Sequence, residues 1–407
     1  MIINLCVNLN IKQLSLNTSQ IFMIHKLYKL IYHPTFTNKM RDGKKVALIT
    51  GIGGQDGSYL AEFLLSKGYL VRGIIRRASF PNSTRIDHLD IYGPGPDSPY
   101  YLIYGDLSDA TSVRNALEQF KPDEIYNLGA QSHVGISFNN PESTINFNLL
   151  GTLRILEAIK DMKVDCRFYQ ASSSEMFGIS PPPQNENTPM LPQSPYGIFK
   201  LGAYHLVRLY RNAHGMFASN GILFNHESPR RGWNFVTKKI TREIAKILVG
   251  EKKKIVLGNL DAKRDWGFSK EYVEAMWKIL QHDHPDDFVI ATHETHTVRD
   301  FLREAFNIFE LNFEDFLEIN DRYKRPAEVP ALLGDYSKAK NILNWEPKTK
   351  FKDLVRMMIV SDLKEKLEQT GLIPINGISN SDDYYLEKGR ELARKINAEN
   401  KLMQQGI

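Results

Sequence analysis

Residues 46–57 of the chain read VALITGIGGQDG, an apolar run followed by a turn with glycine at positions 51, 54 and 57. The apolar run predicts a buried strand, and the spacing of Leu60, Phe63 and Leu64 predicts a helix directly after the turn. Glycine here permits a tight turn and lets the backbone approach a pyrophosphate, which the amino-terminal end of the helix attracts. The stretch predicts the start of a dinucleotide-binding fold. A tight turn without a ligand is the alternative.

Strand and helix patterns alternate along the chain after this turn. We expect further strands at 70–75, 101–104, 124–128, 166–171 and 218–224, and helices at 58–67, 111–120, 144–162 and 196–214. Strands separated by helices pair in parallel through right-handed crossovers. The pattern therefore predicts an α/β fold with a doubly wound Rossmann sheet. Beyond residue 224 the alternation weakens, which indicates a smaller, discontinuous α/β lobe, with 288–291 returning to the sheet.

Length and composition limit the possible classes. The 407 residues are 42% hydrophobic and 24% charged, as in a soluble globular protein, and no apolar stretch is long enough to predict a membrane span. Cys6 and Cys166 are the two cysteines of the sequence, so neither a disulfide scaffold nor a cysteine-built zinc site is expected, and we predict no metal site. Because disulfides are not expected, we predict that the protein lies in the cytoplasm. Most of the net charge of +5 comes from four lysines in the first forty residues, so no nucleic-acid partner is expected.

Residues 1–40 stand apart from this pattern because they contain no glycine and no acidic residue. We interpret them as a disordered extension or as sequence preceding a start at Met40. An organelle-targeting peptide is the alternative, since such peptides are poor in acids, although no arginine occurs before Arg41.

The end of the second expected strand indicates which dinucleotide is bound. A site for NAD usually has Asp or Glu about 20 residues after the glycine turn. Here Arg76 and Arg77 follow the strand, with Ser79 and Arg85 nearby. Paired arginines can hold a 2′-phosphate through charge-assisted hydrogen bonds, so the sequence favours NADP. A solvated loop is the alternative.

Tyr196 and Lys200 have the spacing of a catalytic pair on one face of a helix. A nearby ammonium favours the phenolate and makes the phenol a usable base. Upstream, Ser172, Ser173 and Ser174 close an expected strand and precede Glu175, a candidate second base for removing a proton from carbon. An amphipathic helix and an exposed loop glutamate are the alternatives. Together with the glycine turn, the pattern points to the short-chain dehydrogenase/reductase superfamily.

Within that superfamily the chain resembles the GDP-mannose 4,6-dehydratases, from residue 45 to about 365. The resemblance rests on motifs at 48–57 (LITGIGGQDG), 126–134 (YNLGAQSHV), 170–178, 225–236 (NHESPRRGWNFV), 257–267 (LGNLDAKRDWG) and 323–329 (YKRPAEV). It implies an NADP-binding Rossmann domain at 43–229 plus about 263–292 and a GDP-sugar domain at about 230–262 plus 293–370. The remainder, 371–407, is a charged tail with a helix-like stretch at 382–403, in which we expect a solvated helix or disorder because no apolar stripe is evident.

The resemblance also implies roles for individual residues. Ser173, Glu175, Tyr196 and Lys200 would be catalytic. The NADP contacts would be Gly51, Ile52, Gly53, Gly54, Gln55, Asp56, Arg76, Arg77, Ser79, Asp106, Leu107, Leu128, Gly129, Ala130, Gln131, Ser132, Tyr196, Lys200, His226 and Arg231, and the GDP-sugar contacts Asn225, Arg264, Arg325 and Glu328.

The implied activity is that of a hydro-lyase which converts GDP-mannose to GDP-4-keto-6-deoxymannose, ahead of GDP-fucose and related deoxyhexoses. The sugar is oxidised at carbon 4, loses water across carbons 5 and 6, and receives the hydride back at carbon 6. A homodimer or homotetramer is implied as well. The alternatives are a nucleotide-sugar epimerase, a dTDP-glucose-type dehydratase, or a non-catalytic binding protein that kept the fold.

Several positions depart from the family pattern. Ser173 replaces a threonine and keeps its hydroxyl, Gly53 replaces a threonine in the glycine turn, and Ser143 stands where a cofactor-contacting tyrosine is usual. Gly197 and Phe199 replace small residues inside the Tyr196–Lys200 turn. None of these changes removes a proton-carrying group, so we expect activity to be retained.

Overall fold

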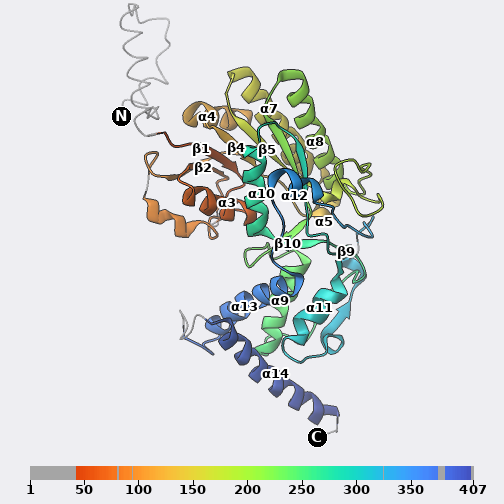
Figure 1. Ribbon diagram of the computed structural model, residues 1–407. Coiled ribbons are helices and arrows are strands. Elements are labelled where there is room, and N and C mark those ends of the chain that lie inside the picture. Colours follow the sequence, from red (N-terminus) through yellow and green to blue (C-terminus); the bar gives the residue numbers. More distant parts are fainter. Residues whose placement is uncertain (1–42, 80–81, 94, 324, 375–380, 405–407) are drawn as a thin grey trace, which may run out of the picture.

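A seven-stranded parallel sheet forms the larger lobe of the protein (Figure 1). The computed structural model describes residues 43–79, 82–93, 95–323, 325–374 and 381–404, so the interpretation of residues 1–40 lies outside the described residues. The strand order is β11-β6-β5-β4-β1-β2-β3. The strands are β1 (Val46–Thr50), β2 (Leu70–Ile75), β3 (Tyr100–Tyr104), β4 (Glu124–Asn127), β5 (Arg167–Ser173), β6 (Ala218–Leu223) and β11 (Asp287–Ile290). The doubly wound prediction is confirmed, including the return of the chain at β11.

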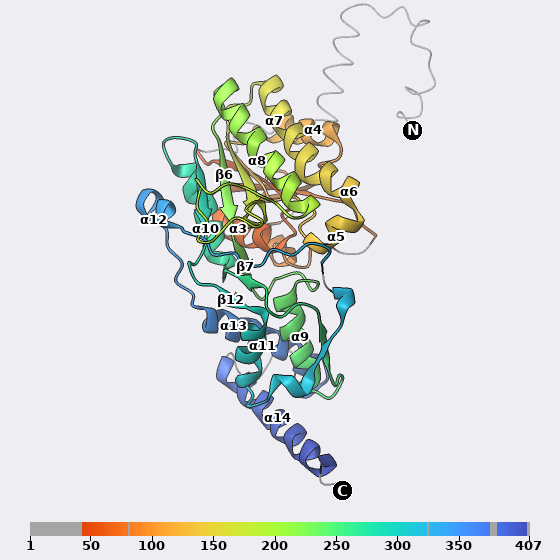
Figure 2. The same cartoon turned by 90° about the vertical axis from the view of Figure 1, so that its right-hand side faces the viewer.

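Helices cover both faces of this sheet (Figure 2). One core joins the sheet to helices α4, α7 and α8, and another joins its opposite face to α3, α10 and α12. The larger-lobe helices are α3 (Gln55–Ser66), α4 (Ala110–Phe120), α5 (Val134–Asn139), α6 (Pro141–Ile145), α7 (Gly151–Met162), α8 (Pro195–His214), α10 (Ser269–Gln281) and α12 (Ser337–Leu343), with 3₁₀ turns at Asp87–Tyr92 and Ser174–Met176. Both faces are apolar, as parallel sheets require.

The helix expected at 144–162 forms, but it begins earlier and contains a π-helical segment that was not predicted from the sequence. The structure has α6, then a π-helical segment at Asn146–Leu150, then α7. The buried Asn148 within this segment accepts a hydrogen bond from the backbone N–H of Gln131 and donates one to its carbonyl oxygen. Such bulges often occur at functional sites, and sequence periodicity does not reveal them.

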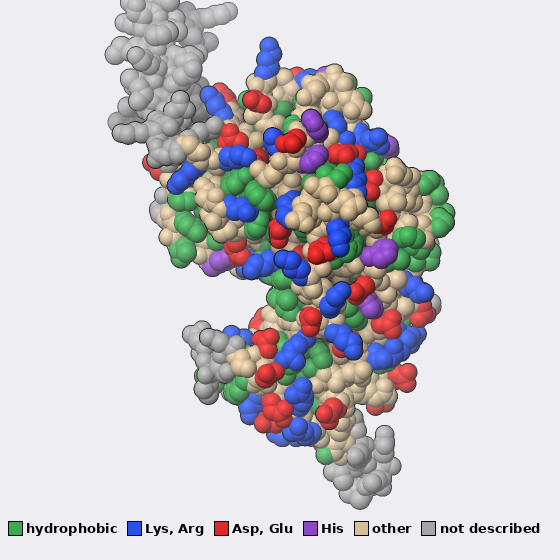
Figure 3. Space-filling model, in the orientation of Figure 1, with side chains coloured by type: hydrophobic (Ala, Val, Ile, Leu, Met, Phe, Trp, Pro, Cys, Tyr) green, Lys and Arg blue, Asp and Glu red, His purple; other side chains and the backbone are tan. Residues whose placement is uncertain are grey.

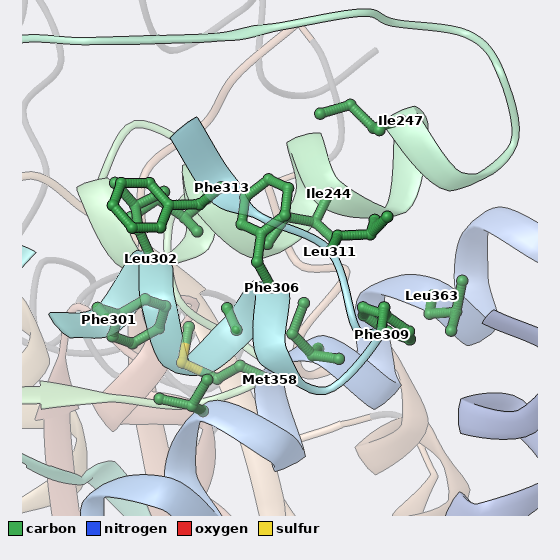
Figure 4. Packing of buried hydrophobic residues seen from close by; sticks show 14 of the residues in the cluster. Ile244, Ile247, Phe301, Leu302, Phe306, Phe309, Leu311, Phe313, Met358 and Leu363 are labelled. Atoms are coloured by element: carbon green, nitrogen blue, oxygen red, sulfur yellow. The ribbon is translucent and has the colours of Figure 1, made fainter. Parts of the chain in front are cut away.

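The smaller lobe has a core of its own, built from α9 (Val236–Leu248), α11 (Val298–Asn307) and α13 (Phe351–Gln369). Figure 4 shows part of it, to which Ile244 of α9, Phe301 of α11 and Met358 of α13 all contribute. Short strand pairs complete the chain: β7 (Asn225–Glu227) with β10 (Trp266–Phe268), β9 (Lys263–Arg264) with β12 (His296–Thr297), and β8 (Ile255–Leu257) with β13 (Leu317–Ile319). Further 3₁₀ turns lie at Phe313–Phe316 and Asp321–Tyr323.

We expected a solvated helix or disorder at 382–403. A helix forms there, but one of its faces is buried. Helix α14 (Asp382–Gln404) does form, but Tyr385, Leu386 and Ala393 are buried in the smaller lobe's core, and Leu392 and Ile396 pack against it. These positions lie on one face at helical spacing. Charged neighbours such as Glu387 and Arg390, which pair with each other, mask that stripe in the sequence.

The two lobes meet at a narrower part of the molecule, where Figure 3 shows Lys and Arg side chains on both sides. Within 293–370, α12 packs against the larger lobe's core rather than that of the smaller lobe. The division into two discontinuous domains stays a prediction. Among the described residues, no helix is long and apolar enough to cross a membrane.

Candidate active site

The glycine turn after β1 is shaped by close backbone contacts. Gly51 has φ +69°, and a Cβ atom there would lie 2.8 Å from the Gly129 nitrogen. A Cβ atom on Gly57 would lie 2.4 Å from the Gly51 carbonyl oxygen. No side chain caps α3, whose N-cap residue is Gly54, so no side-chain oxygen takes up the first N–H groups of the helix. The turn suits an anionic group, since backbone N–H groups and the helix dipole are both available there.

A partly buried ion pair joins this turn to the segment after β6. His226 Nε2 lies 2.8 Å from Asp56 Oδ2, and His226 Nδ1 lies 2.7 Å from the Phe224 carbonyl oxygen. Asp56 also accepts a hydrogen bond from the Ser269 hydroxyl at the start of α10. Burial opposes the charged carboxylate, but the charge and hydrogen bond of His226 outweigh burial and hold the pKa of Asp56 well below its usual range.

Arg76 and Arg77 directly follow β2 and are exposed. The Arg76 guanidinium lies 5.3 Å from the Phe147 ring centre and that of Arg77 lies 5.7 Å from the Tyr104 ring centre. Among the described residues neither arginine pairs with a carboxylate. Arg85 is fixed instead, because it donates to the carbonyl oxygen of Arg230 and to that of Gly53. The two free guanidinium groups suit a phosphate ester, whereas the exposed Ser79 shows no contact to them.

The remaining predicted dinucleotide contacts gather beside the turn. Gly129 donates its N–H to the Thr50 hydroxyl, and Asn148 fixes the backbone of Gln131. The Leu107 side chain packs where a Cβ atom of Gly129 would lie. The loops after β1, β2, β3 and β4 thus meet at the carboxyl edge of the sheet, where doubly wound folds bind their ligands. Ser132 is exposed there.

The four predicted catalytic residues lie together at the end of β5 and the start of α8. Ser173, Glu175, Tyr196 and Lys200 are each less than 9% exposed. The Ser173 hydroxyl accepts a hydrogen bond from the Glu175 backbone, Lys200 Nζ donates to the Ala171 carbonyl oxygen at 2.7 Å, and Nζ lies 5.9 Å from the Tyr196 ring centre. The arrangement provides a phenol, an ammonium and a carboxylate around one strand end.

Burial is the main influence on the pKa values of Tyr196 and Lys200 in the free protein. It raises the pKa of Tyr196 to about 12, even though a hydrogen bond with Ser173 works in the other direction. Burial also lowers the pKa of Lys200 to about 8, although Asp56 favours the charged amine. Tyr196 therefore stays protonated at neutral pH until a further positive charge arrives beside it.

Residues from the distant motifs complete the site on the side of the smaller lobe. Glu175 lies 3.6 Å from an Arg325 nitrogen and 4.0 Å from an Arg264 nitrogen. Glu328 lies 3.0 Å from an Arg264 nitrogen and 3.4 Å from an Arg325 nitrogen. Asn225 brings a buried side-chain oxygen without a hydrogen-bond partner. The structure thus brings together the predicted GDP-sugar residues and the predicted second base.

Three residues that sequence reasoning gave no role also hold this site. The fully buried Asp265 accepts hydrogen bonds from Thr292, from the His293 N–H and from the Gly334 N–H, and thereby fixes the strand that carries Arg264. Arg230 binds Glu62 and Ser58 of α3, while Asn148 binds Gln131. In the sequence, Asp265 follows the predicted substrate contact Arg264, and Arg230 precedes the predicted NADP contact Arg231. This adjacency is the one feature of the sequence that could have pointed to them.

At two of the positions that depart from the family pattern, the neighbouring backbone leaves little room for a side chain. A Cβ atom on Gly197 would lie 2.8 Å from the Glu175 carbonyl oxygen, so α8 approaches the Glu175 backbone closely. A Cβ atom on Gly53 would lie 2.7 Å from the Asn82 carbonyl oxygen. Ser143 is exposed on α6.

Comparison with known proteins identifies a family and its relatives. Residues 48–358 match the family model described as GDP-mannose 4,6 dehydratase. The chain is 53% identical to GDP-mannose 4,6 dehydratase 1 of Arabidopsis thaliana, over 79% of this chain and 90% of that protein. It is 50% identical to the human GDP-mannose 4,6 dehydratase, over 80% and 93%, and 48% identical to that of Vibrio cholerae, over 79% and 94%.

Solved structures share the fold at lower sequence identity. RMD from Pseudomonas aeruginosa, solved with NADPH, superposes with a TM-score of 0.64 and 21% identity, over 79% of this chain and 98% of that one. UDP-glucose 4-epimerase of Thermotoga maritima, solved with UDP-glucose, superposes with a TM-score of 0.68 and 22% identity, over 79% and 99%. At this identity the likeness supports the fold alone.

Proposed function

The chain belongs to the GDP-mannose 4,6-dehydratase family and converts GDP-mannose to the 4-keto-6-deoxy product, and we propose that it does so as an NADP-dependent hydro-lyase with Ser173, Glu175, Tyr196 and Lys200 as its catalytic residues. The observation that carries this assignment is the buried cluster of those four side chains at the end of β5. A nicotinamide cofactor fits the family and the fold, and the choice of NADP rests on the paired arginines after β2.

The residues present fit a dinucleotide phosphate. The glycine turn leaves the amino-terminal end of α3 uncapped, and Arg76 and Arg77 remain free of carboxylates among the described residues. We assign the pyrophosphate to the turn from Gly51 to Asp56 and the 2′-phosphate to Arg76 and Arg77. When bound, NADP would supply a hydride acceptor at the start of the cycle and the same hydride at its end.

Proton transfer then falls to this chain's own side chains. Tyr196 accepts the proton of the sugar's 4-hydroxyl as carbon 4 is oxidised, with the Lys200 ammonium stabilising the phenolate and Ser173 hydrogen-bonding the substrate oxygen. The ketone acidifies the hydrogen on carbon 5, which Glu175 removes. Glu175 returns the proton to the departing 6-hydroxyl, so one water leaves. Carbon 6 then receives the hydride, and carbon 5 receives the proton that Tyr196 took from the 4-hydroxyl, which restores both side chains.

The charged groups facing Glu175 suit the nucleotide part of the substrate. Arg264 and Arg325 bring two guanidinium groups that match a diphosphate, and Glu328 brings a carboxylate that can accept hydrogen bonds from a guanine edge. We therefore assign the diphosphate to the two arginines, the base to Glu328, and a sugar hydroxyl to Asn225, whose buried oxygen has no partner in the free protein.

The test compares a Glu175→Gln variant with the exposed control Glu318→Gln. In the Glu175→Gln protein we expect NADP binding within twofold of wild type and loss of the keto-deoxy product by about a hundredfold or more, because a general base typically contributes 10²–10⁴-fold. The control should keep full turnover. Turnover by Glu175→Gln within a few fold of wild type would refute the role of Glu175.

Substrate choice tests the assignment itself. The wild-type protein is incubated separately with GDP-mannose, UDP-glucose and dTDP-glucose, and the 4-keto product is followed by its absorbance in alkali. We expect product from GDP-mannose alone. Product from the other two sugars and none from GDP-mannose would defeat the assignment. Light scattering on the same preparation tests the homodimer or homotetramer that we propose. The cytoplasm remains our proposed compartment, because the sequence has few cysteines.

A further inference from the structure

The hydrogen bonds of His226 require both ring nitrogens to donate. Nδ1 faces the Phe224 carbonyl oxygen at 2.7 Å and Nε2 faces the Asp56 carboxylate at 2.8 Å. A carbonyl oxygen only accepts hydrogen bonds, and so does an ionised carboxylate. A neutral imidazole has a single N–H and could serve one of these partners. The geometry therefore fits a doubly protonated, positively charged ring.

The surroundings of the pair agree with an imidazolium beside a carboxylate. Both oxygens of Asp56 already face donors, since Oδ1 accepts from the Ser269 hydroxyl and from the Gln55 amide. Burial disfavours the charged ring, but the Asp56 charge and hydrogen bond outweigh it and raise the pKa of His226, while Arg231 opposes them. On the side of α10 the ring stacks on Tyr272, with the ring centres 4.7 Å apart.

The position of Asp56 makes this charge important for an anionic ligand. Asp56 lies in the first turn of α3, next to the glycine turn to which we assign the dinucleotide pyrophosphate. An uncompensated carboxylate there would repel the pyrophosphate, although it also ties α3 to α10 through Ser269. A fixed positive charge on His226 removes that repulsion and keeps the tie.

We propose that His226 is a constitutive imidazolium that neutralises Asp56, so that the amino-terminal end of α3 stays attractive to a dinucleotide. The proposal rests on the NADP site described above and extends it. His226 acts through Asp56 and is a positioning residue: its contribution to binding is the cancellation of a charge 2.8 Å away. A direct contact between the ring and the cofactor is the alternative that the experiment separates.

The experiment is a charge-compensation cycle read by direct NADP titration. His226→Gln removes the nearest positive charge from Asp56 and leaves only the weaker influence of Arg231, so the dissociation constant should rise at least about tenfold, and the loss should shrink at high salt. Adding Asp56→Asn removes the unpaired charge and should restore binding to within about threefold of wild type. His88→Gln is the matched control, because His88 pairs with Glu62 at 2.6 Å on the surface, and it should change affinity less than twofold.

The outcomes separate the explanations. If Asp56→Asn fails to rescue His226→Gln while both proteins keep wild-type circular dichroism, charge compensation is overturned and direct contact stands. ¹⁵N NMR of the cofactor-free protein gives a second measure, with both His226 nitrogens expected to be protonated at pH 7; a neutral ring at that pH overturns the proposal. A wild-type protein that binds no dinucleotide would instead overturn the proposed function, and the NMR result would still decide the charge of His226.

Discussion

Lys200 carries a positive charge that is costly to bury, and replacing it should change how stability depends on pH. Its side chain is 4% exposed, and burial lowers its pKa from 10.5 to about 8. The folded protein therefore releases this proton at lower pH than the unfolded chain does. Since the unfolded state binds more protons between pH 8 and 10.5, the free energy of unfolding rises with pH in that window through this group.

The size of the effect follows from the two pKa values. With a shift of this size, the contribution of Lys200 to the free energy of unfolding changes by about 2 kcal/mol between pH 7 and pH 9.5. In Lys200→Met the group cannot titrate, so wild type should gain that amount relative to the variant as the pH rises. The hydrogen bond to the Ala171 carbonyl does not cancel this slope, because a neutral amine also donates it.

The assay is urea unfolding of the cofactor-free protein at pH 7, 8, 9 and 9.5, with hydrogen exchange over peptides from β5 and α8. Site-resolved exchange assigns the free energy to the larger lobe, which matters in a protein with two cores. Lys253→Met, which removes an exposed lysine, should run parallel to wild type. Parallel curves for Lys200→Met would refute the claim that Lys200 is held charged in a site that disfavours charge.

Three further substitutions test the packing of the smaller lobe and of the glycine turn. The Lys238 ammonium lies 2.5 Å from the Asp362 carboxylate, so Asp362→Leu leaves a buried charge unpaired and should lower the free energy of unfolding by about 3–5 kcal/mol. Adding Lys238→Met should restore most of that loss. A loss below 1 kcal/mol in urea unfolding of Asp362→Leu would contradict this. Gly57→Ala should weaken NADP binding more than tenfold in direct titration, because its Cβ would press on the Gly51 carbonyl; unchanged affinity would contradict the close packing. Leu386→Ala should cost about 2–5 kcal/mol of unfolding free energy by urea denaturation, since Leu386 is fully buried, and a loss under 1 kcal/mol would mean that α14 does not brace the smaller lobe.

The sheet could be predicted because each of its strands is marked locally. The run at 46–50 and the run at 70–75 match β1 and β2 residue for residue, since buried parallel strands are continuously apolar and are bounded by turns. The π-helical segment at Asn146–Leu150 escaped prediction for the opposite reason. It carries Asn148, whose hydrogen bonds to the backbone of Gln131 are a contact that helical periodicity does not record.

The site divides in the same way between local motifs and long-range contacts. Tyr196 and Lys200 could be placed together because they are one helical turn apart. The contact of Glu175 with Arg325 depends on how the two lobes meet, and that of Asp56 with His226 on the pairing of α3 with the segment after β6. Composition and spacing do not encode such distances, so those partnerships had to come from the structure.

The charge states of the free protein suggest why this family couples proton removal to the cofactor. Burial leaves Tyr196 protonated, with a pKa near 12, and makes Lys200 only weakly able to hold its proton, with a pKa near 8. Both shifts share one cause, since a dry site penalises phenolate and ammonium alike. A positive charge added at the carboxyl end of β5 would stabilise the phenolate, and the phenolate so formed would in turn stabilise the Lys200 ammonium. Under the proposed mechanism, the proton of Tyr196 therefore becomes labile only beside an oxidised dinucleotide, and a sugar bound without cofactor would meet a protonated phenol at its 4-hydroxyl.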